Sequence, residues 1–358
     1  MINYTDLAIA FFIALIATFL LTYPVKKLAI KIGVVDLPNH RKIHTKVTPR
    51  LGGLAIFLGV FLGGLYLQPQ HEHLPEIILG AVVILITGTF DDRYSLRPII
   101  KLTGQLIAAS FLISSGLIID RITLPIFGVV ELEFVSVLVT VIWVVGITNA
   151  INLIDGLDGL ATGVSTIALT SMFIMALIDV QIMAAYLCIV LIGANLGFLY
   201  HNFYPAKIYM GDTGSNFLGY AIAVVSMLSL FKNIALFSFI IPIIILAVPI
   251  FDTLFAILRR AYNKENIMMP DNKHIHYQLI AKGFSHRKTV LIIYAFSALF
   301  GVMAILFSNA SLTMALFITF LVILLLQIFA ELGGLVMGGR KPIIYIMKKV
   351  FKIKKSDF

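Results

Sequence analysis

Residues 6–23 read DLAIAFFIALIATFLLTY, a run in which only the first residue carries a charge. An α-helix rises about 1.5 Å per residue, so about 20 apolar residues cross the roughly 30 Å hydrocarbon core of a bilayer. The run has no basic segment before it, and Lys26 and Lys27 follow it in place of a small-residue cleavage site. It therefore predicts a first membrane span rather than a cleaved secretory signal.

The composition extends this conclusion to the rest of the chain. Of the 358 residues, 60% are hydrophobic and 13% are charged, whereas soluble domains carry about 25% charged residues. A water-soluble fold cannot bury so large an apolar share, so much of it must face lipid. The single cysteine, Cys188, lies in an apolar run and excludes an intrachain disulfide.

Apolar stretches of span length recur along the chain. Between two of them, residues 120–133 contain Pro125 and Gly128 and predict an external connection with a small hairpin. We predict an all-α polytopic membrane protein, one integral membrane domain over residues 1–358, with about eleven transmembrane helices. These lie at about residues 6–23, 51–68, 76–90, 99–119, 134–149, 160–178, 183–200, 214–230, 234–257, 290–308 and 312–335.

The basic residues are unequally divided between the two sides of this predicted topology. Cytoplasmic connections of membrane proteins carry an excess of Lys and Arg. The division therefore predicts a multi-pass protein of the cell membrane with an external N-terminus and a basic cytoplasmic tail over residues 336–358. The formal charge of +9 then indicates attraction to anionic lipid of the inner leaflet rather than to nucleic acid. Of the 27 Lys and Arg, 25 lie in the connections 24–50, 91–101, 201–213 and 258–289 and in the tail, and only Arg121 and Lys232 lie opposite.

Two adjacent acids, Asp91 and Asp92, end the third predicted span in the segment TFDDRYSLRP. Neighbouring carboxylates repel each other, and a divalent cation or a cationic partner relieves that repulsion. The alternative is a solvated helix end paired with Arg93 or Arg97. Because other cytoplasmic connections supply further acids, we favour a functional site.

The segment NAINLIDGLDGL at residues 149–160 places a polar residue at every third position: Asn149, Asn152, Asp155 and Asp158. On a helix these side chains begin close together and then drift around it, and the glycines between them allow a ligand to approach. A plain turn between spans is the alternative, but it does not explain four polar residues among apolar ones. We interpret the segment as part of a substrate site.

In YMGDTGSN at residues 209–216, Asp212 lies between two glycines, and Thr213 or Ser215 offers a cap for the following span. This segment alone does not show whether Asp212 caps the following helix or binds a metal. All five aspartates of these three segments fall on the predicted cytoplasmic side.

His274 and His276 lie in DNKHIHYQL, within the longest basic connection. Two histidines without a cysteine make a poor zinc site, whereas they suit hydrogen bonding to phosphate oxygens. A solvated histidine pair is the alternative. The first basic connection attracts anionic lipid and would also attract a phosphorylated substrate; it contains Arg41, Lys42, His44, Lys46 and Arg50.

Together these segments resemble the polyprenyl-phosphate N-acetylhexosamine-1-phosphate transferases of glycosyltransferase family 4. The resemblance extends from DLPNHRKIHTK at residues 36–46 to HIHYQL at residues 274–279. Residues 36–46 and PRLGG at residues 49–53 are more similar to the WecA and TagO type than to the MraY type, which favours UDP-N-acetylglucosamine (UDP-GlcNAc) as donor. One departure is Tyr277, which stands where many members have a further histidine.

The resemblance implies roles for individual residues. It implies Mg²⁺, with Mn²⁺ as the alternative ion, bound by Asp212 and Asp92. It implies catalytic roles for Asp91, Asp92, Asp155, Asp158, His274 and His276. It implies substrate binding by Lys46, Asn152, Asn202 and Tyr209, with Tyr209 stacking on uracil, and the polar pattern adds Asn149 to this set.

The expected reaction is Mg²⁺-dependent transfer of GlcNAc-1-phosphate from UDP-GlcNAc to undecaprenyl phosphate at the cytoplasmic face. Release of UMP would start a cell-envelope glycan such as a teichoic acid linkage unit. Two alternatives stay open at this point: an MraY-type phospho-MurNAc-pentapeptide transferase, and a transporter, which would require polar, unwound positions near the span midpoints. The expected partners are these substrates and membrane lipid, not nucleic acid, and a homodimer is left open.

Overall fold

The computed structural model describes residues 3–36, 47–124, 128–229, 240–264, 274–308 and 310–332. Two of the predictions, the substrate contact of Lys46 and the basic tail over 336–358, lie outside these ranges.

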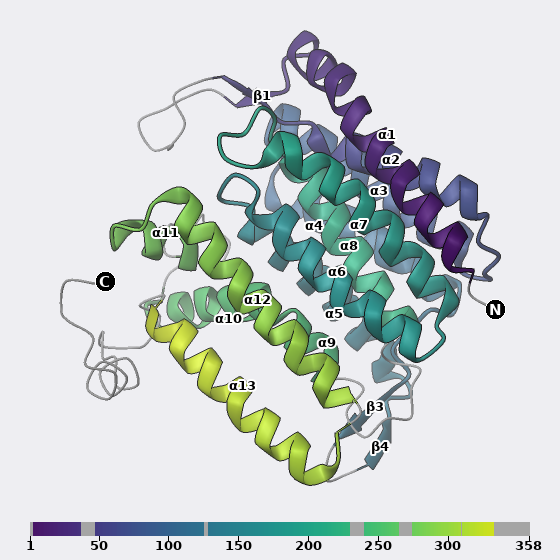
Figure 1. The fold of residues 1–358 in the computed structure, drawn as a ribbon, viewed down its shortest axis with the longest axis vertical. Coiled ribbons are helices and arrows are strands. Elements are labelled where there is room, and N and C mark those ends of the chain that lie inside the picture. The colour runs from purple at the N-terminus through teal and green to yellow at the C-terminus, as the bar shows by residue number, and fades with distance from the viewer. Residues whose placement is uncertain are drawn as a thin grey trace.

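Helices make up most of the described chain, and short connections join them (Figure 1). Two antiparallel hairpins complete it: β1 (Val35–Asp36) pairs with β2 (Thr48–Pro49), and β3 (Arg121–Leu124) pairs with β4 (Gly128–Glu131). The second hairpin confirms the one predicted within residues 120–133. The helices are α1 (Tyr4–Lys31), α2 (Gly52–Leu67), α3 (Leu74–Tyr94), α4 (Pro98–Ser114), α5 (Val135–Ile154), α6 (Leu160–Ile178), α7 (Ile182–Asn202), α8 (Gly211–Ser229), α9 (Ile240–Ile245), α10 (Ala247–Tyr262), α11 (Ile275–Ala281), α12 (His286–Ser308) and α13 (Leu312–Leu332).

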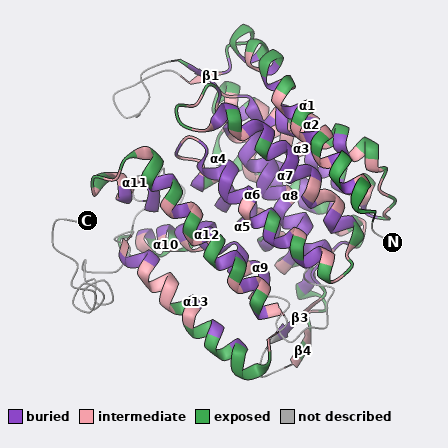
Figure 2. Cartoon of the chain, in the orientation of Figure 1, coloured by how far each residue is buried: buried purple, intermediate pink, exposed green. Residues whose placement is uncertain are grey.

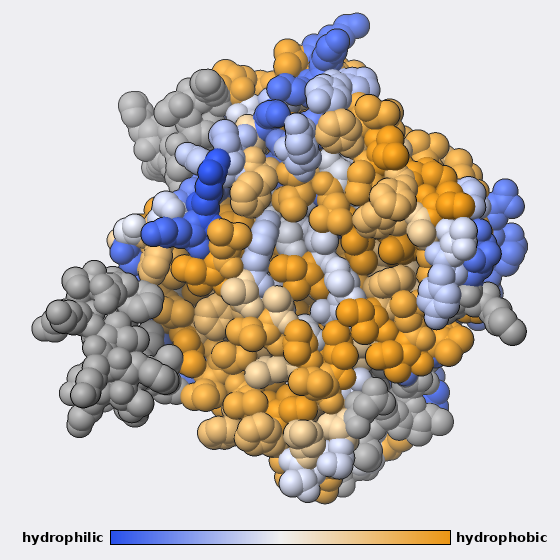
Figure 3. Space-filling view, viewed as in Figure 1, coloured by the Kyte–Doolittle hydropathy of each residue, from blue (hydrophilic) through white to orange (hydrophobic). Residues whose placement is uncertain are grey.

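Seven helices within the described ranges are long and apolar enough to cross a membrane, namely α1, α3, α5, α6, α7, α12 and α13. Helices α2 and α4 are apolar but shorter. Figure 3 shows a broad apolar face between hydrophilic groups at opposite edges of the molecule, as expected for a membrane-embedded surface. The chain is therefore a multi-pass membrane protein built from helices. The predicted count of eleven spans and the orientation of the termini stay predictions.

Two predicted spans differ from simple lipid-facing helices. The stretch predicted at 214–230 forms α8, in which nearly every residue is buried, because α2, α3, α5, α6 and α7 all pack around it. Figure 2 shows this buried centre. In the stretch predicted at 234–257, the described part is divided into α9 and α10, which meet at Leu246. An apolar run predicts burial from water but does not distinguish lipid from protein as the neighbour.

Helix α8 is approached closely by α2, where Gly53 lies against Gly214. A β-carbon added to Gly53 would lie 2.2 Å from the Gly214 Cα, a distance that real β-carbons essentially never show. Backbone hydrogen bonds from Gly52 N to the Tyr209 oxygen (3.0 Å) and from Gly53 N to the Met210 oxygen (2.9 Å) fix the same junction. The start of α2 is thereby joined to the segment that leads into α8.

The connections gather at two opposite ends of the molecule (Figure 1). The N-terminus and the β3–β4 hairpin lie at one end, and β1 and α11 lie at the other. The second end also holds the corner between α3 and α4, where Ser95 takes a left-handed conformation and Pro98 begins α4, a position that proline favours. The acids of the predicted site lie at helix ends or in a connection: Asp91 and Asp92 in the last turn of α3, Asp212 at the start of α8, and Asp155 and Asp158 between α5 and α6.

Candidate active site

Asp92 ties the end of α3 to the start of α8. Its Oδ1 accepts a hydrogen bond from Asp212 N (2.8 Å), and its Oδ2 accepts from Thr213 N (2.9 Å) and Thr213 Oγ1 (2.7 Å). The first backbone N–H groups of a helix lack partners within the helix, so this carboxylate caps α8 from another helix. The cap that the sequence suggested for Thr213 or Ser215 is thus supplied by Asp92, and both of its oxygens are occupied within the protein.

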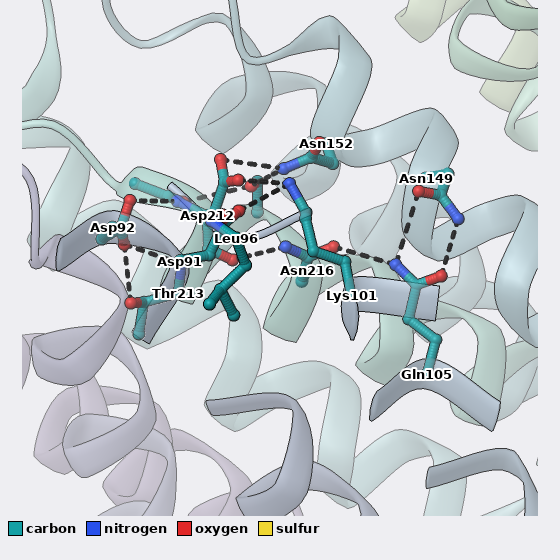
Figure 4. Close-up of polar contacts among 12 residues, drawn as sticks. Asp91, Asp92, Leu96, Lys101, Gln105, Asn149, Asn152, Asp212, Thr213 and Asn216 are labelled. Atoms are coloured by element: carbon teal, nitrogen blue, oxygen red, sulfur yellow. Dashed lines mark hydrogen bonds and ion pairs between the residues drawn. The ribbon is translucent and has the colours of Figure 1, made fainter. Parts of the chain in front are cut away.

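Lys101 connects the two other acids of this cluster. Its ammonium Nζ lies 2.6 Å from Asp91 Oδ2 and 2.5 Å from Asp212 Oδ2. The other oxygen of Asp91 accepts from Leu96 N at 2.7 Å and so closes the corner between α3 and α4. A cation of the chain itself therefore neutralises Asp91 and Asp212, a pair that is not adjacent in the sequence. Figure 4 shows Lys101 beside both carboxylates.

Arg50 supplies a second cation from the connection before α2. The strand-like pairing of Arg50 with Tyr209 places its Nη2 3.6 Å from Asp92 Oδ1 and 3.8 Å from Asp212 Oδ1. Its side chain is one-third exposed, so the guanidinium faces both the acids and the solvent.

Asn152 contacts the cluster from α5. Its Nδ2 donates to Asp212 Oδ1 at 3.2 Å and to Ser215 Oγ at 2.8 Å. Asn149, one turn earlier, lies in a different group, in which its Nδ2 donates to Gln105 Oε1 at 2.8 Å and Gln105 Nε2 donates to Asn216 Oδ1 at 3.3 Å. Asn216 in turn donates to the Asp212 carbonyl at 2.7 Å. Figure 4 places Asn149 and Gln105 beside, not within, the acidic cluster.

The segment of four polar residues is helical only in its first half. Helix α5 ends at Ile154, Asp155 leaves the helical conformation, and α6 begins after Gly159. Burial and the charge of Asp212 raise the pKa of Asp155 to about 7, against the opposing effect of Arg50. Asp155 is thus electrostatically part of the cluster although it belongs to a turn.

Asp158 and Asn202 hold the backbone around that turn. Asp158 Oδ2 accepts from Ala206 N at 2.9 Å. The Asn202 amide is buried; its oxygen accepts from Gly159 N (3.1 Å) and Thr162 Oγ1 (2.8 Å), and its nitrogen donates to the Ile208 carbonyl (3.0 Å). Asn202 therefore braces the loop before Tyr209, and a direct substrate contact by this residue stays a prediction.

Tyr209 is half-buried between that loop and the start of α2. Its backbone N donates to the Pro49 carbonyl at 2.8 Å. Burial and the charge of Asp158 raise the pKa of its hydroxyl to about 12, so the ring stays uncharged at neutral pH. Stacking of this ring on uracil stays a prediction.

His274 and His276 lie at and just inside the start of α11 and reach the same turn. Their rings are parallel, with centroids 5.9 Å apart. A β-carbon added to Gly156 would lie 2.1 Å from His276 Nε2, so His276 packs directly on the turn between α5 and α6. Burial lowers the pKa of His276 to about 4, which leaves its ring neutral at physiological pH.

Comparisons with known proteins agree with this arrangement. The model of glycosyl transferase family 4 matches residues 74–230, which contain the clustered aspartates and Lys101. The chain is 47% identical over 351 residues to a probable undecaprenyl-phosphate N-acetylglucosaminyl 1-phosphate transferase of Bacillus subtilis, covering 97% of each chain.

The chain belongs to glycosyl transferase family 4. It is also 36% identical to a decaprenyl-phosphate N-acetylglucosaminephosphotransferase of Mycobacterium tuberculosis, over 96% of this chain and 90% of the relative. With an undecaprenyl-phosphate alpha-N-acetylglucosaminyl 1-phosphate transferase of Salmonella typhi it shares 31% identity over 80% and 82% of the two chains. The family resemblance predicted from the motifs is confirmed.

Whether the cluster of this family 4 member suits a divalent cation depends on which of its carboxylates reach the solvent. No group of three or more His, Cys, Asp or Glu in metal-binding geometry occurs among the described residues. Mg²⁺ is commonly held by one or two carboxylates together with substrate phosphates and water. Asp212, whose side chain is 22% exposed, suits such a site with Asp91 beside it, whereas the Asp92 side chain is fully buried and occupied by α8.

Three site residues of this family 4 chain were missed or underused by the sequence interpretation. Lys101 was counted only as a basic residue of its connection, and Asp252 was not considered. Arg50 was named only as one of five residues in a connection that would attract a phosphorylated substrate. For Lys101 a signal was present, since it is a single cation at the start of the otherwise uncharged run 99–119. Asp252 offers the same signal as a lone acid within the predicted span 234–257.

Proposed function

We propose that this chain transfers GlcNAc-1-phosphate from UDP-GlcNAc to undecaprenyl phosphate and releases UMP. The names of the relatives in Bacillus and Salmonella support the acceptor and the sugar phosphate. A lipid acceptor suits a site at the ends of membrane-spanning helices, because the isoprenoid tail stays in the bilayer while the phosphate reaches the surface.

One observation carries the proposal: two cations, Lys101 and Arg50, flank the Asp212 carboxylate at this end of the molecule. Lys101 lies 2.5 Å from Asp212, and Arg50 lies 3.8 Å from it. Phosphoryl transfer depends on positioning and charge neutralisation more than on covalent help from the protein. Fixed cations beside a carboxylate can position two phosphorylated substrates and can also neutralise their charge.

In the proposed reaction an oxygen of the acceptor phosphate attacks the β-phosphorus of the donor. The bond from that phosphorus to the bridging oxygen breaks, and its electron pair leaves with UMP. A phosphate monoester has a second pKa of about 6, so the acceptor is mostly a dianion at neutral pH and requires little general-base help. We assign Asp91 to orienting the acceptor phosphate, because it shares Lys101 with Asp212.

We assign the metal to Asp212, with Asp91 as its neighbour and with either Mg²⁺ or Mn²⁺ as the ion. When bound, the ion would neutralise charge on the diphosphate oxygens. Asp92 has its oxygens bonded to the start of α8, so its part in this proposal is to hold Asp212 in place. This assignment revises the sequence-based expectation that Asp92 is itself a ligand.

We assign the donor nucleotide to the surface formed by Tyr209, Asp155 and Asp158. The uncharged Tyr209 ring suits stacking on uracil, and stacking of a base on an aromatic side chain contributes about 1–3 kcal/mol. The cytoplasm supplies nucleotide sugars, so the site end of the molecule would face the cytoplasm and the N-terminus the outside. The lipid-linked product would begin a cell-envelope glycan such as a teichoic acid linkage unit.

The test is a reconstituted reaction with purified protein in detergent. Labelled UDP-GlcNAc and undecaprenyl phosphate should give UMP and a labelled lipid, while UDP-MurNAc-pentapeptide should give neither. A chelator should abolish turnover, and Mg²⁺ should restore it. Turnover of the pentapeptide donor alone would replace the proposal with the MraY-type reaction, and full activity in chelator would remove the metal from it.

A further inference from the structure

Asp252 is a buried acid on α10, with only 1% of its surface exposed. The helix is otherwise apolar around it, with the sequence AVPIFDTLFAI over residues 247–257. A buried carboxylate is costly unless hydrogen bonds compensate it. The contacts of Asp252 therefore indicate why an acid stands at this position.

Both oxygens of Asp252 meet the start of α11. Oδ1 accepts from Ile275 N at 2.9 Å, and Oδ2 lies 2.9 Å from His274 Nδ1. An ionised carboxylate only accepts hydrogen bonds, so the pairing places a proton on His274 Nδ1. The second ring nitrogen, Nε2, is then the atom of His274 that remains to meet a substrate.

The same contact reaches the turn between α5 and α6. The His274 ring lies parallel to the His276 ring at 5.9 Å, and His276 packs on Gly156 so closely that no β-carbon fits there. Gly156 directly follows Asp155, whose carboxylate interacts with Asp212. A row of contacts thus leads from Asp252 through both histidines to the acidic cluster.

We propose that Asp252 is a positioning residue for the transfer reaction, which it serves by fixing the tautomer and orientation of His274 so that Nε2 hydrogen-bonds a phosphate oxygen of the donor. This proposal rests on the proposed function. Asp252 itself is separated from substrate by the histidine ring. In Asp252 the two partners bond different oxygens. An asparagine at this position replaces one of those oxygens with an NH₂ group, which donates and does not accept, so one of the two contacts is lost in this geometry.

The test is a double-mutant cycle on kcat/KM for UDP-GlcNAc. Replacing the hydrogen-bond partner of a metal-ligating histidine typically costs about 10- to 100-fold, and by analogy Asp252→Asn should lose a factor in that range. Because Asp252 acts through His274, the pair Asp252→Asn with His274→Ala should be no slower than His274→Ala alone. Thr253→Val, an isosteric change at the next position of α10, is the matched control and should keep wild-type kinetics.

Two outcomes would overturn the proposal: multiplied losses in the double variant, or wild-type kinetics in a folded Asp252→Asn protein. A second measurement requires no variant of Asp252. Nitrogen-15 NMR of histidine-labelled wild-type protein, with the His274 signal assigned from His274→Gln, should find Nδ1 protonated at pH 7. A deprotonated Nδ1 would refute the pairing. Wild-type protein that releases no UMP would instead refute the proposed function.

Discussion

At the scale of single residues, the contacts of the site converge on Asp212. Its two oxygens meet Lys101, Asn152 and Arg50, and its backbone N is held by Asp92. The side chain is therefore fixed in position but still partly exposed. Such a carboxylate suits the metal-binding role that we propose for it.

Asp212→Asn should abolish turnover with little effect on folding. The amide keeps the size of the side chain and its contact with Asn152, but it loses the charge that pairs with Lys101 and holds a cation. We expect kcat to fall by about three orders of magnitude, the size of effect seen when a single charge-stabilising group is removed from an active site. The rate of UMP release measures kcat, and the unfolding temperature in detergent shows whether the variant is folded. Glu72→Gln, which changes an exposed acid at the other end of the molecule, is the control. Activity above a tenth of wild type would contradict the role.

Lys101→Met should leave Asp91 and Asp212 facing each other without their shared cation. Like charges in one site repel, so we expect lower thermal stability as well as a loss of at least about 100-fold in kcat/KM. Lys27→Met removes an exposed lysine from α1 at the same end of the molecule and should change neither quantity. A fully active Lys101→Met enzyme would show that Lys101 serves only to neutralise the two acids.

His276 should make the protein less stable in acid. Its folded pKa is about 4, below the value of 6.5 for a free histidine, so the unfolded chain binds a proton first as the pH falls. Stability is complete above pH 6.5 and is lost toward pH 4, at about 1.4 kcal/mol per pH unit. Between pH 7 and 4.5, the free energy of unfolding of His276→Gln should therefore fall by about 2–3 kcal/mol less than that of wild type. Thermal unfolding at the two pH values measures this difference. His71→Gln, at the opposite end of the molecule, is the control. Equal losses in all three proteins would place the ring in a solvated environment.

At the scale of elements, the sequence predicted most helices but not how they pack. Each predicted span overlaps a described helix, because long apolar runs have few other structures available in lipid. The ends were less accurate: the run at 99–119 stops as a helix at Ser114, before the left-handed Gly116. The burial of α8 was not predictable from hydropathy, since lipid and protein neighbours both favour apolar side chains.

The junction of α2 with α8 gives a packing prediction within one helix. Gly53→Ala would force a β-carbon into the backbone of Gly214, and such overpacking typically costs about 1–3 kcal/mol. Gly64→Ala, on the same helix, has nothing within 4 Å of the added carbon and gains up to about 1 kcal/mol of helix propensity. Thermal unfolding of the two variants in detergent should show opposite shifts. Equal shifts would mean that α2 tolerates a wider separation from α8.

At the scale of the whole molecule, the site depends on contacts between distant parts of the chain. The aspartates were predictable because each stands in a polar segment among apolar ones. Lys101 and Asp252 each stood out as a lone charge in an apolar run, but their partners could not be predicted because they lie elsewhere in the chain. Lys101 is separated from Asp212 by 111 residues, and Asp252 is separated from His274 by 22. Only the packing of α3, α4, α5 and α8 into one bundle brings the site together.

Because this packing gathers the site at one end of the molecule, the orientation of the chain across the membrane determines which side of the membrane the site faces. Ser285, exposed just before α12, lies at the site end, and Glu72, whose carboxylate is 75% exposed, lies between α2 and α3 at the other. Because basic residues concentrate at the site end, Glu72→Cys should react with a membrane-impermeant maleimide in intact cells, and Ser285→Cys should react only after permeabilisation. The native Cys188 is buried and should give no background. The reverse labelling would put the acidic cluster outside the cell, where a cytoplasmic nucleotide sugar cannot reach it. Labelling of both positions in intact cells would mean that no membrane separates the two ends.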